Sequence, residues 1–312
     1  MDPEQDRESA AEAVYQGLRP LLFAIAYRMT GSVGEAEDIM QEAFLRWHRA
    51  QAGGTEVESP RAFLTTVTTR LAIDHLRSAR VRRESYIGPW LPEPLVGDVY
   101  DQVARHAELA GSLSVAFLIL LESLTPVERA VFLLREVFEY GYDEIAGIVA
   151  KTEPNVRQIL ARARRRIDAG TPRFEASAQA REELASRFFA ASQRGDMAAL
   201  LELLAPDVVF VGDGGGKAQA LPQPMHGQEH VARLILGIFA RGRFLNARAR
   251  AVQVNGHPGG MGVDAEGRLV NVWAFGVADG RIQAVWSVVN PEKLGHLGPV
   301  SDVARLPRDT GS

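Results

Sequence analysis

The chain has 312 residues, about twice the usual length of one domain, so length alone favours two or three domains. Hydrophobic residues make up 46% and charged residues 24%, a globular composition that excludes wholesale disorder. The absence of cysteine excludes disulfides, thiol catalysis and cysteine-ligated metals. A net charge of −4 neither favours nor excludes binding to nucleic acid, so the local distribution of charge is the relevant evidence.

The N-terminal segment is acidic and polar, and it has neither the basic nor the apolar region of a secretory signal. The most apolar stretch, Val115 to Leu121, is too short to cross a bilayer. We therefore expect a cytoplasmic protein with no membrane association.

The first part of the chain, from Tyr15 to Leu76, has a helical pattern. Ser59 followed by Pro60 is typical of a helix start within it. Apolar residues recur at helical spacing in one stretch, at Ala36, Ile39, Met40, Ala43, Phe44 and Trp47.

A second helical block runs from about Leu113 to Ile167. Thr125-Pro126 opens one of its helices, and Glu128 falls in the first turn, where an acid favours the helix dipole. Between the blocks, residues 86–98 carry three prolines and two glycines and are predicted to form an extended linker. Trp90 in this linker is compatible with an exposed polyproline segment or with packing into a groove, and the aromatic ring favours packing.

The C-terminal part has a different pattern. Residues 178–204 and 227–241 are predicted helical, and alternating β-branched and aromatic residues predict strands over 249–254, 269–277 and 282–289. Three dipeptides are expected to break them: Asn255-Gly256, Gly259-Gly260 and the hairpin signal Asp279-Gly280. Helices followed by an antiparallel sheet predict an α+β domain with its helices on one face.

The segment from Tyr142 to Ile167 has the pattern of a helix-turn-helix. A short helix over 143–150 is followed by a turn, and Thr152 is expected to cap a second helix whose apolar face is narrow. Such a helix can enter the major groove, where Arg and Gln read base edges and further arginines bind phosphates. Its polar and basic residues are Asn155, Arg157, Gln158, Arg162, Arg164, Arg165 and Arg166. An ordinary helical hairpin on a bundle surface is the alternative.

This second block resembles region four of the extracytoplasmic-function (ECF) sigma factors, which reads the promoter −35 element. The first block resembles region two of the same family. Its segment AEDIMQEAFLRW is similar to the helix that docks on the clamp helices of the RNA polymerase β′ subunit, which implies contacts by Asp38, Gln41 and Glu42. Two motifs in order, joined by a linker, imply a factor that binds two promoter elements at once.

Residues 63–83 resemble the segment of region two that opens and captures the −10 element. A basic helix suits this task because a flipped base and a displaced strand must be held. Arg70 stands where the family often has Asn, so the flipped-base pocket is not carried over. The implied contact residues are Arg70, Asp74, His75, Arg77, Arg80, Arg82 and Arg83.

The C-terminal part resembles a SnoaL-like (NTF2-like) cone. One branch of the sigma family carries such a domain with three further segments, which implies regulation by the fused domain in place of a separate anti-sigma factor. The segments are present in this chain as Trp90, Leu91, Pro92, Glu93 and Pro94, as Asp213, Gly214, Gly215, Gly216 and Lys217, and as Asn290, Pro291, Glu292, Lys293 and Leu294. From the residues alone, the glycine run is a loop that docks on the linker or the N-terminal domains, a plain surface turn, or a phosphate cradle without Walker spacing.

The predicted architecture is therefore multidomain, with two all-α domains followed by an α+β cone. The expected boundaries are 8–83 for region two, 84–112 for the linker, 113–170 for region four, 176–296 for the cone and 297–312 for a tail. The expected partners are core RNA polymerase, through its β′ clamp helices and β subunit, and promoter DNA. We expect a monomer when free, and no catalytic residue, metal or cofactor; a small-molecule ligand of the cone remains open. The alternatives are a cone enzyme with DNA-binding helices, for which Asp207 is the candidate acid–base residue, and a ligand-sensing helix-turn-helix regulator.

Overall fold

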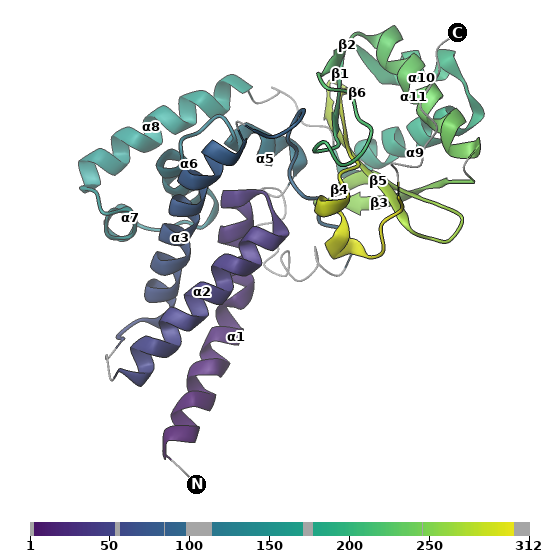
Figure 1. The fold of residues 1–312 in the computed structure, drawn as a ribbon. Coiled ribbons are helices and arrows are strands. Elements are labelled where there is room, and N and C mark those ends of the chain that lie inside the picture. The colour runs from purple at the N-terminus through teal and green to yellow at the C-terminus, as the bar shows by residue number, and fades with distance from the viewer. Residues whose placement is uncertain are drawn as a thin grey trace. The chain divides into compact units, whose positions relative to one another are not determined.

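The computed structural model describes residues 3–53, 57–83, 85–97, 114–170, 177–244 and 246–302 (Figure 1). By its contacts the chain divides into two compact units. The first unit is Met1–Glu84, Asp101–Leu113 and Phe117–Thr171; the second is Ser85–Tyr100, Ser114–Ala116 and Pro172–Ser312. The described part of the predicted linker therefore belongs to the C-terminal unit.

The first unit begins with three helices that pack against one another: α1 (Pro3–Thr30), α2 (Val33–Ala52) and α3 (Pro60–Arg83) (Figure 1). The Ser32 side chain caps α2 by accepting from the Glu35 amide. The predicted apolar stripe of α2 faces the core, where Trp47 packs on Phe63 with 5.8 Å between ring centroids. Burial of one face per helix holds the three together.

The helix α5 (Val115–Leu121) begins at the boundary of the two units. The first unit continues with α6 (Pro126–Phe132), a π-helical turn η3 (Leu133–Val137), α7 (Tyr142–Val149) and α8 (Glu153–Gly170). Thr125 and Glu128 form a complete capping box at the start of α6. Ala150 ends α7 with left-handed φ of 53°, and α8 begins three residues later. The predicted helix-turn-helix is thus present in α7 and α8, and the apolar face of α8 is buried as expected.

The second unit packs three helices, α9 (Ala178–Arg194), α10 (Met197–Leu203) and α11 (Gln228–Phe244), on one sheet (Figure 1). Gly195 in a left-handed conformation and the Asp196 cap divide the predicted continuous helix over 178–204 into α9 and α10. The sheet order is β2-β1-β6-β5-β4-β3. The strands are β1 (Leu204–Asp213), β2 (Met225–His226), β3 (Arg248–Val254), β4 (His257–Val263), β5 (Leu269–Ala278) and β6 (Arg281–Val288).

The strand β1 lies parallel to β6, while the other neighbours are antiparallel. The expected turns Asn255-Gly256 and Asp279-Gly280 are confirmed, each with positive φ at both residues, as a two-residue hairpin requires. The fold class, helical domains followed by an α+β cone, is confirmed as well.

One expected strand break is wrong. Gly259-Gly260 lies inside β4 instead of between strands. A Cβ on Gly260 would overlap the ring of Phe189, and one on Gly259 would overlap the backbone of Trp273. Glycine is therefore required at this point by close packing of neighbours, not by a turn. Among the residues that the structure describes, no helix is both long and apolar enough to span a membrane.

Candidate polymerase, DNA and linker-binding sites

One face of α2 carries the residues expected to contact polymerase. Asp38 and Gln41 are exposed, and Glu42 is partly exposed. Leu45, 41% exposed, follows at helical spacing, so an apolar side chain adjoins the polar ones. Glu42 accepts a hydrogen bond from Arg46 at 2.8 Å, which lowers the pKa of Glu42 and keeps it charged. The face is acidic with an apolar neighbour, a composition that suits a protein partner.

The residue Arg70 of α3 does not project freely into solvent. Its Nε donates to the carbonyl of Ile148 and its Nη2 to that of Gly147, both at 2.8 Å. These carbonyls belong to the last turn of α7, where a helix carries partial negative charge. Beside them, the hydroxyls of Thr65 and Tyr140 are hydrogen bonded at 2.9 Å. A predicted −10 residue thus joins the first helical block to the helix-turn-helix.

Other residues expected at the −10 element have local partners. His75 lies 2.8 Å from Glu35, and Arg77 lies 3.1 Å from Asp74 in a well-exposed pair. Arg80, Arg82 and Arg83 are in α3, but their side chains lie outside the described part of the structure.

On α8, the exposed residues closest to its N-terminus include Asn155, Arg157 and Gln158. The guanidinium of Arg157 stacks on Tyr142, 3.8 Å from the ring centroid, which fixes its direction. Neither Asn155 nor Gln158 has a side-chain hydrogen bond to a described residue. Amides so placed are suited to bidentate contacts with base edges.

Three later arginines of α8 face acids of the preceding helices. Arg166 lies 2.6 Å and Arg162 3.7 Å from Glu128, and Arg164 lies 2.7 Å from Glu136. Burial raises the pKa of Glu128, but hydrogen bonds from Thr125 and the two arginine charges outweigh it and lower the pKa below its ordinary value. The sequence pattern indicates for Glu128 only a first-turn position, where an acid favours the helix dipole, and misses that Glu128 also holds α8 in place.

Arg165 completes the set. It is exposed, and its Nε donates to the carbonyl of Ala161 one turn earlier. Arg162, Arg164 and Arg166 are each about half-exposed as well, so their pairing with acids leaves part of every guanidinium open to a phosphate.

In the second unit, the buried carboxylate of Asp213 holds the linker. It accepts hydrogen bonds from the Tyr86 hydroxyl at 2.5 Å and from the Leu91 amide at 2.7 Å. The ammonium of Lys293 lies 2.7 Å from the same carboxylate and donates to the Leu91 carbonyl. We call this set, Tyr86, Leu91, Asp213 and Lys293 together with Asn290, the linker clasp.

Aromatic rings and an amide complete the linker clasp. The Lys293 ammonium lies 4.1 Å from the centroid of Trp90 and 5.0 Å from that of Tyr86. Asn290 donates from Nδ2 to the Tyr86 hydroxyl at 3.0 Å. Burial, first, and the hydrogen bond to Asp213 raise the pKa of Tyr86 well above its ordinary value, so the phenol stays protonated and donates.

The linker lies so close to the loop after β1 that Gly215 and Gly216 have no room for a side chain. A Cβ on Gly215 would overlap the Asn290 amide and the Tyr86 hydroxyl, and one on Gly216 would overlap Ile87. Both glycines have positive φ, at 57° and 70°. Of the interpretations left open by the sequence, the loop that docks on the linker agrees with these contacts. Lys217 pairs at 3.2 Å with Glu292 in an exposed salt bridge.

The remaining residues of the three segments flank the linker clasp. Leu91, Pro92 and Pro94 are buried, and Glu93 is half-buried. The amides of Lys217 and Ala218 donate to the carbonyl of Gly214 and close the glycine loop. Pro291, Glu292 and Lys293 form a short 3-10 turn that ends before the buried Leu294.

Three contacting residues are missed by the sequence pattern. Asn255 exchanges hydrogen bonds with Leu95: its side-chain oxygen accepts from the Leu95 amide at 2.9 Å, and its own amide donates back at 2.8 Å. The ring of His296 lies 2.8 Å from the Pro94 carbonyl. Asn255 is marked only as a turn residue, and Tyr86 and His296 lie outside any motif, so local sequence holds no signal for these roles.

Comparison with known families agrees with this geometry. Residues 14–82 match Sigma-70 region 2, residues 114–167 match Sigma-70 region 4, and residues 185–286 match the SnoaL-like domain. The ECF RNA polymerase sigma factor SigJ of Mycobacterium tuberculosis is 38% identical over 290 residues, which cover 90% of this chain and 92% of SigJ. The probable ECF sigma factor SigI of the same species is 38% identical over 63% of this chain and 67% of its own.

The crystal structure of Mycobacterium tuberculosis SigJ is also similar. It superposes with a TM-score of 0.73 at 35% identity and covers 93% of this chain and 99% of the SigJ chain. Both sigma regions and the fused domain are therefore shared in order with a full-length relative. The chain belongs to the ECF sigma factors of RNA polymerase, transcription initiation factors rather than enzymes, and carries a fused SnoaL-like domain.

Proposed function

We propose that the three surfaces described above divide the work of this sigma factor. The α2 face of Asp38, Gln41 and Glu42 docks on the β′ clamp helices of core polymerase. The basic side of α3 captures the −10 element, and α8 reads the −35 element through Asn155 and Gln158. The acidic character of the α2 face supports a protein partner, because phosphates would be repelled there.

We further propose that the SnoaL-like domain restrains initiation by holding the linker. The observation that carries this proposal is the linker clasp: one buried carboxylate, Asp213, binds Tyr86, the Leu91 backbone and Lys293. The linker joins the two promoter-reading regions in sequence, and its freedom sets which separations between them are accessible. The described part of the linker, residues 85–97, is fixed at both Leu91 and Leu95 and has lost that freedom.

The contact of Arg70 with α7 supports a closed form of the promoter-reading regions. Its guanidinium cannot bind DNA while it donates to Gly147 and Ile148. Promoter DNA would have to displace these carbonyls from Arg70, so DNA binding shifts the equilibrium toward an open form. The fused domain acts through the linker clasp and takes the part of an anti-sigma factor within the same chain.

Promoter-dependent transcription with core polymerase tests the proposal. The full chain would be compared with Asp213→Asn, which breaks the linker clasp, and with Lys217→Gln, which removes only an exposed pair in the same loop. We expect Asp213→Asn to raise the initiation rate and Lys217→Gln to leave it unchanged. A loss of initiation in Asp213→Asn, with folding intact, would show that the linker clasp supports the active geometry instead.

A further inference from the structure

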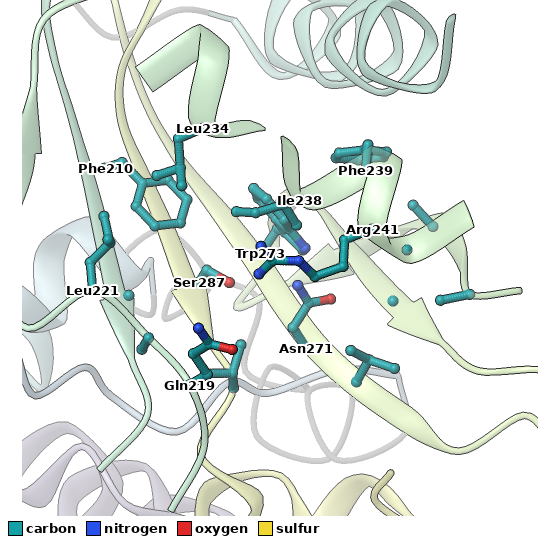
Figure 2. A pocket seen from close by; sticks show the side chains of 18 of the residues that line it. Phe210, Gln219, Leu221, Leu234, Ile238, Phe239, Arg241, Asn271, Trp273 and Ser287 are labelled. Atoms are coloured by element: carbon teal, nitrogen blue, oxygen red, sulfur yellow. The ribbon is translucent and has the colours of Figure 1, made fainter. Parts of the chain in front are cut away.

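The SnoaL-like domain has a half-open cavity of about 550 Å³ between α11 and the sheet (Figure 2). This volume lies within the range of pockets that hold small-molecule ligands, about 300–1,000 Å³. Its walls are largely apolar and aromatic: Phe210 of β1, Ile238 and Phe239 of α11, and Trp273 of β5. Flat rings on several sides favour a ligand with a ring-sized apolar body.

Polar groups of the cavity gather at one side. Figure 2 shows the side-chain ends of Arg241, Asn271 and Ser287 directed into a common space, with Gln219 below them. Asn271 is 7% and Ser287 3% exposed, so both are held in the wall of the domain while they line the cavity. A few polar groups placed in a mostly apolar wall are the arrangement that fixes the orientation of a bound ligand.

The charge of the lining selects the kind of ligand. The described lining includes two arginines, Arg241 and Arg248, and no aspartate, glutamate or histidine. An arginine beside hydrogen-bonding groups is suited to a carboxylate, which it can bind in a bidentate manner. No carboxylate or imidazole of the described lining is available to accept a proton from a substrate, so the lining supports binding rather than acid–base chemistry.

The cavity and the linker clasp share the same strand ends. Gly212 and Ser287, which line the cavity, are paired across β1 and β6, and the next residue of β1 is Asp213. The amides of Val289, another lining residue, and Asn290 both donate to the Asp213 carbonyl at 2.9 and 3.0 Å.

The loop after β1 connects the two sites as well. Its first part, Asp213 to Gly216, contacts the linker, and its last part, Gln219 to Leu221, lines the cavity. A molecule that orders Gln219–Leu221 therefore also limits the movement of the glycines against Tyr86. Coupling between two sites of this kind is reciprocal.

We propose that this cavity binds a carboxylic acid with an aromatic, ring-sized body, and that the bound acid stabilises the linker clasp through the loop 213–221. The regulatory half of this inference rests on the proposed role of the linker clasp in initiation; the binding half does not.

The first test is direct titration of the full chain by calorimetry with 2-naphthoate and with its neutral analogue 2-naphthalenemethanol. We expect one saturable site for the acid and binding of the alcohol at least about tenfold weaker, as charge-assisted hydrogen bonds imply. Absence of saturable acid binding, or equal affinity for acid and alcohol, would overturn the proposed ligand class.

Matched variants locate the site. Arg241→Gln is expected to lower the affinity for 2-naphthoate by roughly 10- to 100-fold. Arg233→Gln, an exposed residue of the same helix paired with Glu229, should not change the affinity. Ala249→Phe fills the cavity from β3 and should abolish binding while thermal unfolding stays cooperative. Equal affinity in the wild type and in both cavity variants would place the acid elsewhere and refute the site.

Hydrogen exchange of residues 85–97 tests the coupling. Saturating 2-naphthoate should slow amide exchange in this segment. Because the coupling is reciprocal, Asp213→Asn, which breaks the linker clasp, should lower the affinity for 2-naphthoate by the same factor by which the bound acid stabilises the linker clasp. Unchanged exchange in the presence of bound acid would refute the coupling. Both measurements are made without polymerase, so their failure is separate from a failure of the transcription assay.

Discussion

The carboxylate of Asp213 and the ammonium of Lys293 lie 2.7 Å apart, and both residues are almost fully buried although 80 positions separate them in the chain. A charge removed from water in this way is tolerated only when paired and hydrogen bonded. The Asp213 carboxylate has two further donors, and Lys293 has the Leu91 carbonyl and two aromatic faces. The pair therefore depends on the linker being in place.

Removing one partner of this pair should be costly. Lys293→Met leaves the Asp213 charge buried without its counter-ion, and we expect a loss of about 3–5 kcal/mol in the stability of the C-terminal unit. The exposed pair Lys217–Glu292 provides the control, since Lys217→Met should cost at most about 1 kcal/mol. Urea unfolding followed by tryptophan fluorescence measures both. Similar costs for the two variants would contradict the importance assigned to the buried pair.

A methyl group on the glycine loop should expel the linker. Gly215→Ala adds a Cβ where the Tyr86 hydroxyl and Asn290 lie, at a positive φ that alanine disfavours. Gly267→Ala has the same backbone penalty, at φ 80°, but its Cβ would meet open space. We expect Gly215→Ala to make residues 86–96 susceptible to limited proteolysis and Gly267→Ala to leave them resistant. Equal resistance would mean that the loop yields without releasing the linker.

Glu128 should make stability depend on acidity. Because its pKa is lowered in the folded chain, its contribution is present above its unfolded value, near about 4.3, and is lost as the pH falls through the lower folded value. Glu128→Gln should cost about 1–3 kcal/mol at pH 7. The difference in unfolding free energy between wild type and Glu128→Gln should then shrink as the pH falls below about 4.3. Urea unfolding from pH 7 to pH 3 follows this difference, and Glu58→Gln on an exposed residue is the control.

Specific and nonspecific contacts of α8 should separate by mutation. Gln158→Ala is expected to reduce the binding free energy by about 1–3 kcal/mol for a duplex selected from a random library. For a scrambled duplex the binding free energy should change little. Arg164→Ala should weaken both duplexes alike, since phosphate contacts carry no sequence information. Fluorescence anisotropy at fixed salt measures each affinity. If Gln158→Ala weakens both duplexes equally, Gln158 does not read a base.

Arg70 should hold the closed form of the first unit. Arg70→Ala removes both hydrogen bonds to the end of α7, and we expect faster amide exchange around Gly147 to Lys151. Arg77→Ala, whose exposed pair with Asp74 is confined to α3, should leave exchange in α7 unchanged. Unaltered exchange in Arg70→Ala would show that other contacts keep α7 in place.

Local features of the sequence predicted much of the fold. The apolar stripe of α2, the helix start at Thr125-Pro126, and the strand breaks at Asn255-Gly256 and Asp279-Gly280 all depend on residues within one or two turns of chain. The family resemblance added the three segments around the linker but not how they meet.

Contacts between residues far apart in the chain could not be predicted from pattern. Lysine is among the least buried residue types, so nothing in the sequence marks Lys293 as internal. Gly259-Gly260 has the local pattern of a turn. The feature that requires glycine at Gly260 is the ring of Phe189, which lies about 70 residues earlier and leaves no local signal. Arg70 was expected to bind DNA because residues 63–83 resemble the −10 segment of region two, and only packing against α7 reveals its contact with Gly147 and Ile148.

The position of Lys293 also sets an order of events during synthesis. Leu91 precedes Lys293 by 202 residues, so its binding partner is translated about 10–40 s later at about 5–20 residues per second. The helices α1 to α3 precede Leu91, and α5 to α8 are complete within that interval. The strand β6, which must lie beside β1 before Asp213 and Lys293 meet, comes near its end. On the proposed function, a nascent chain therefore has its promoter-reading helices before it has the domain that holds residues 86–97.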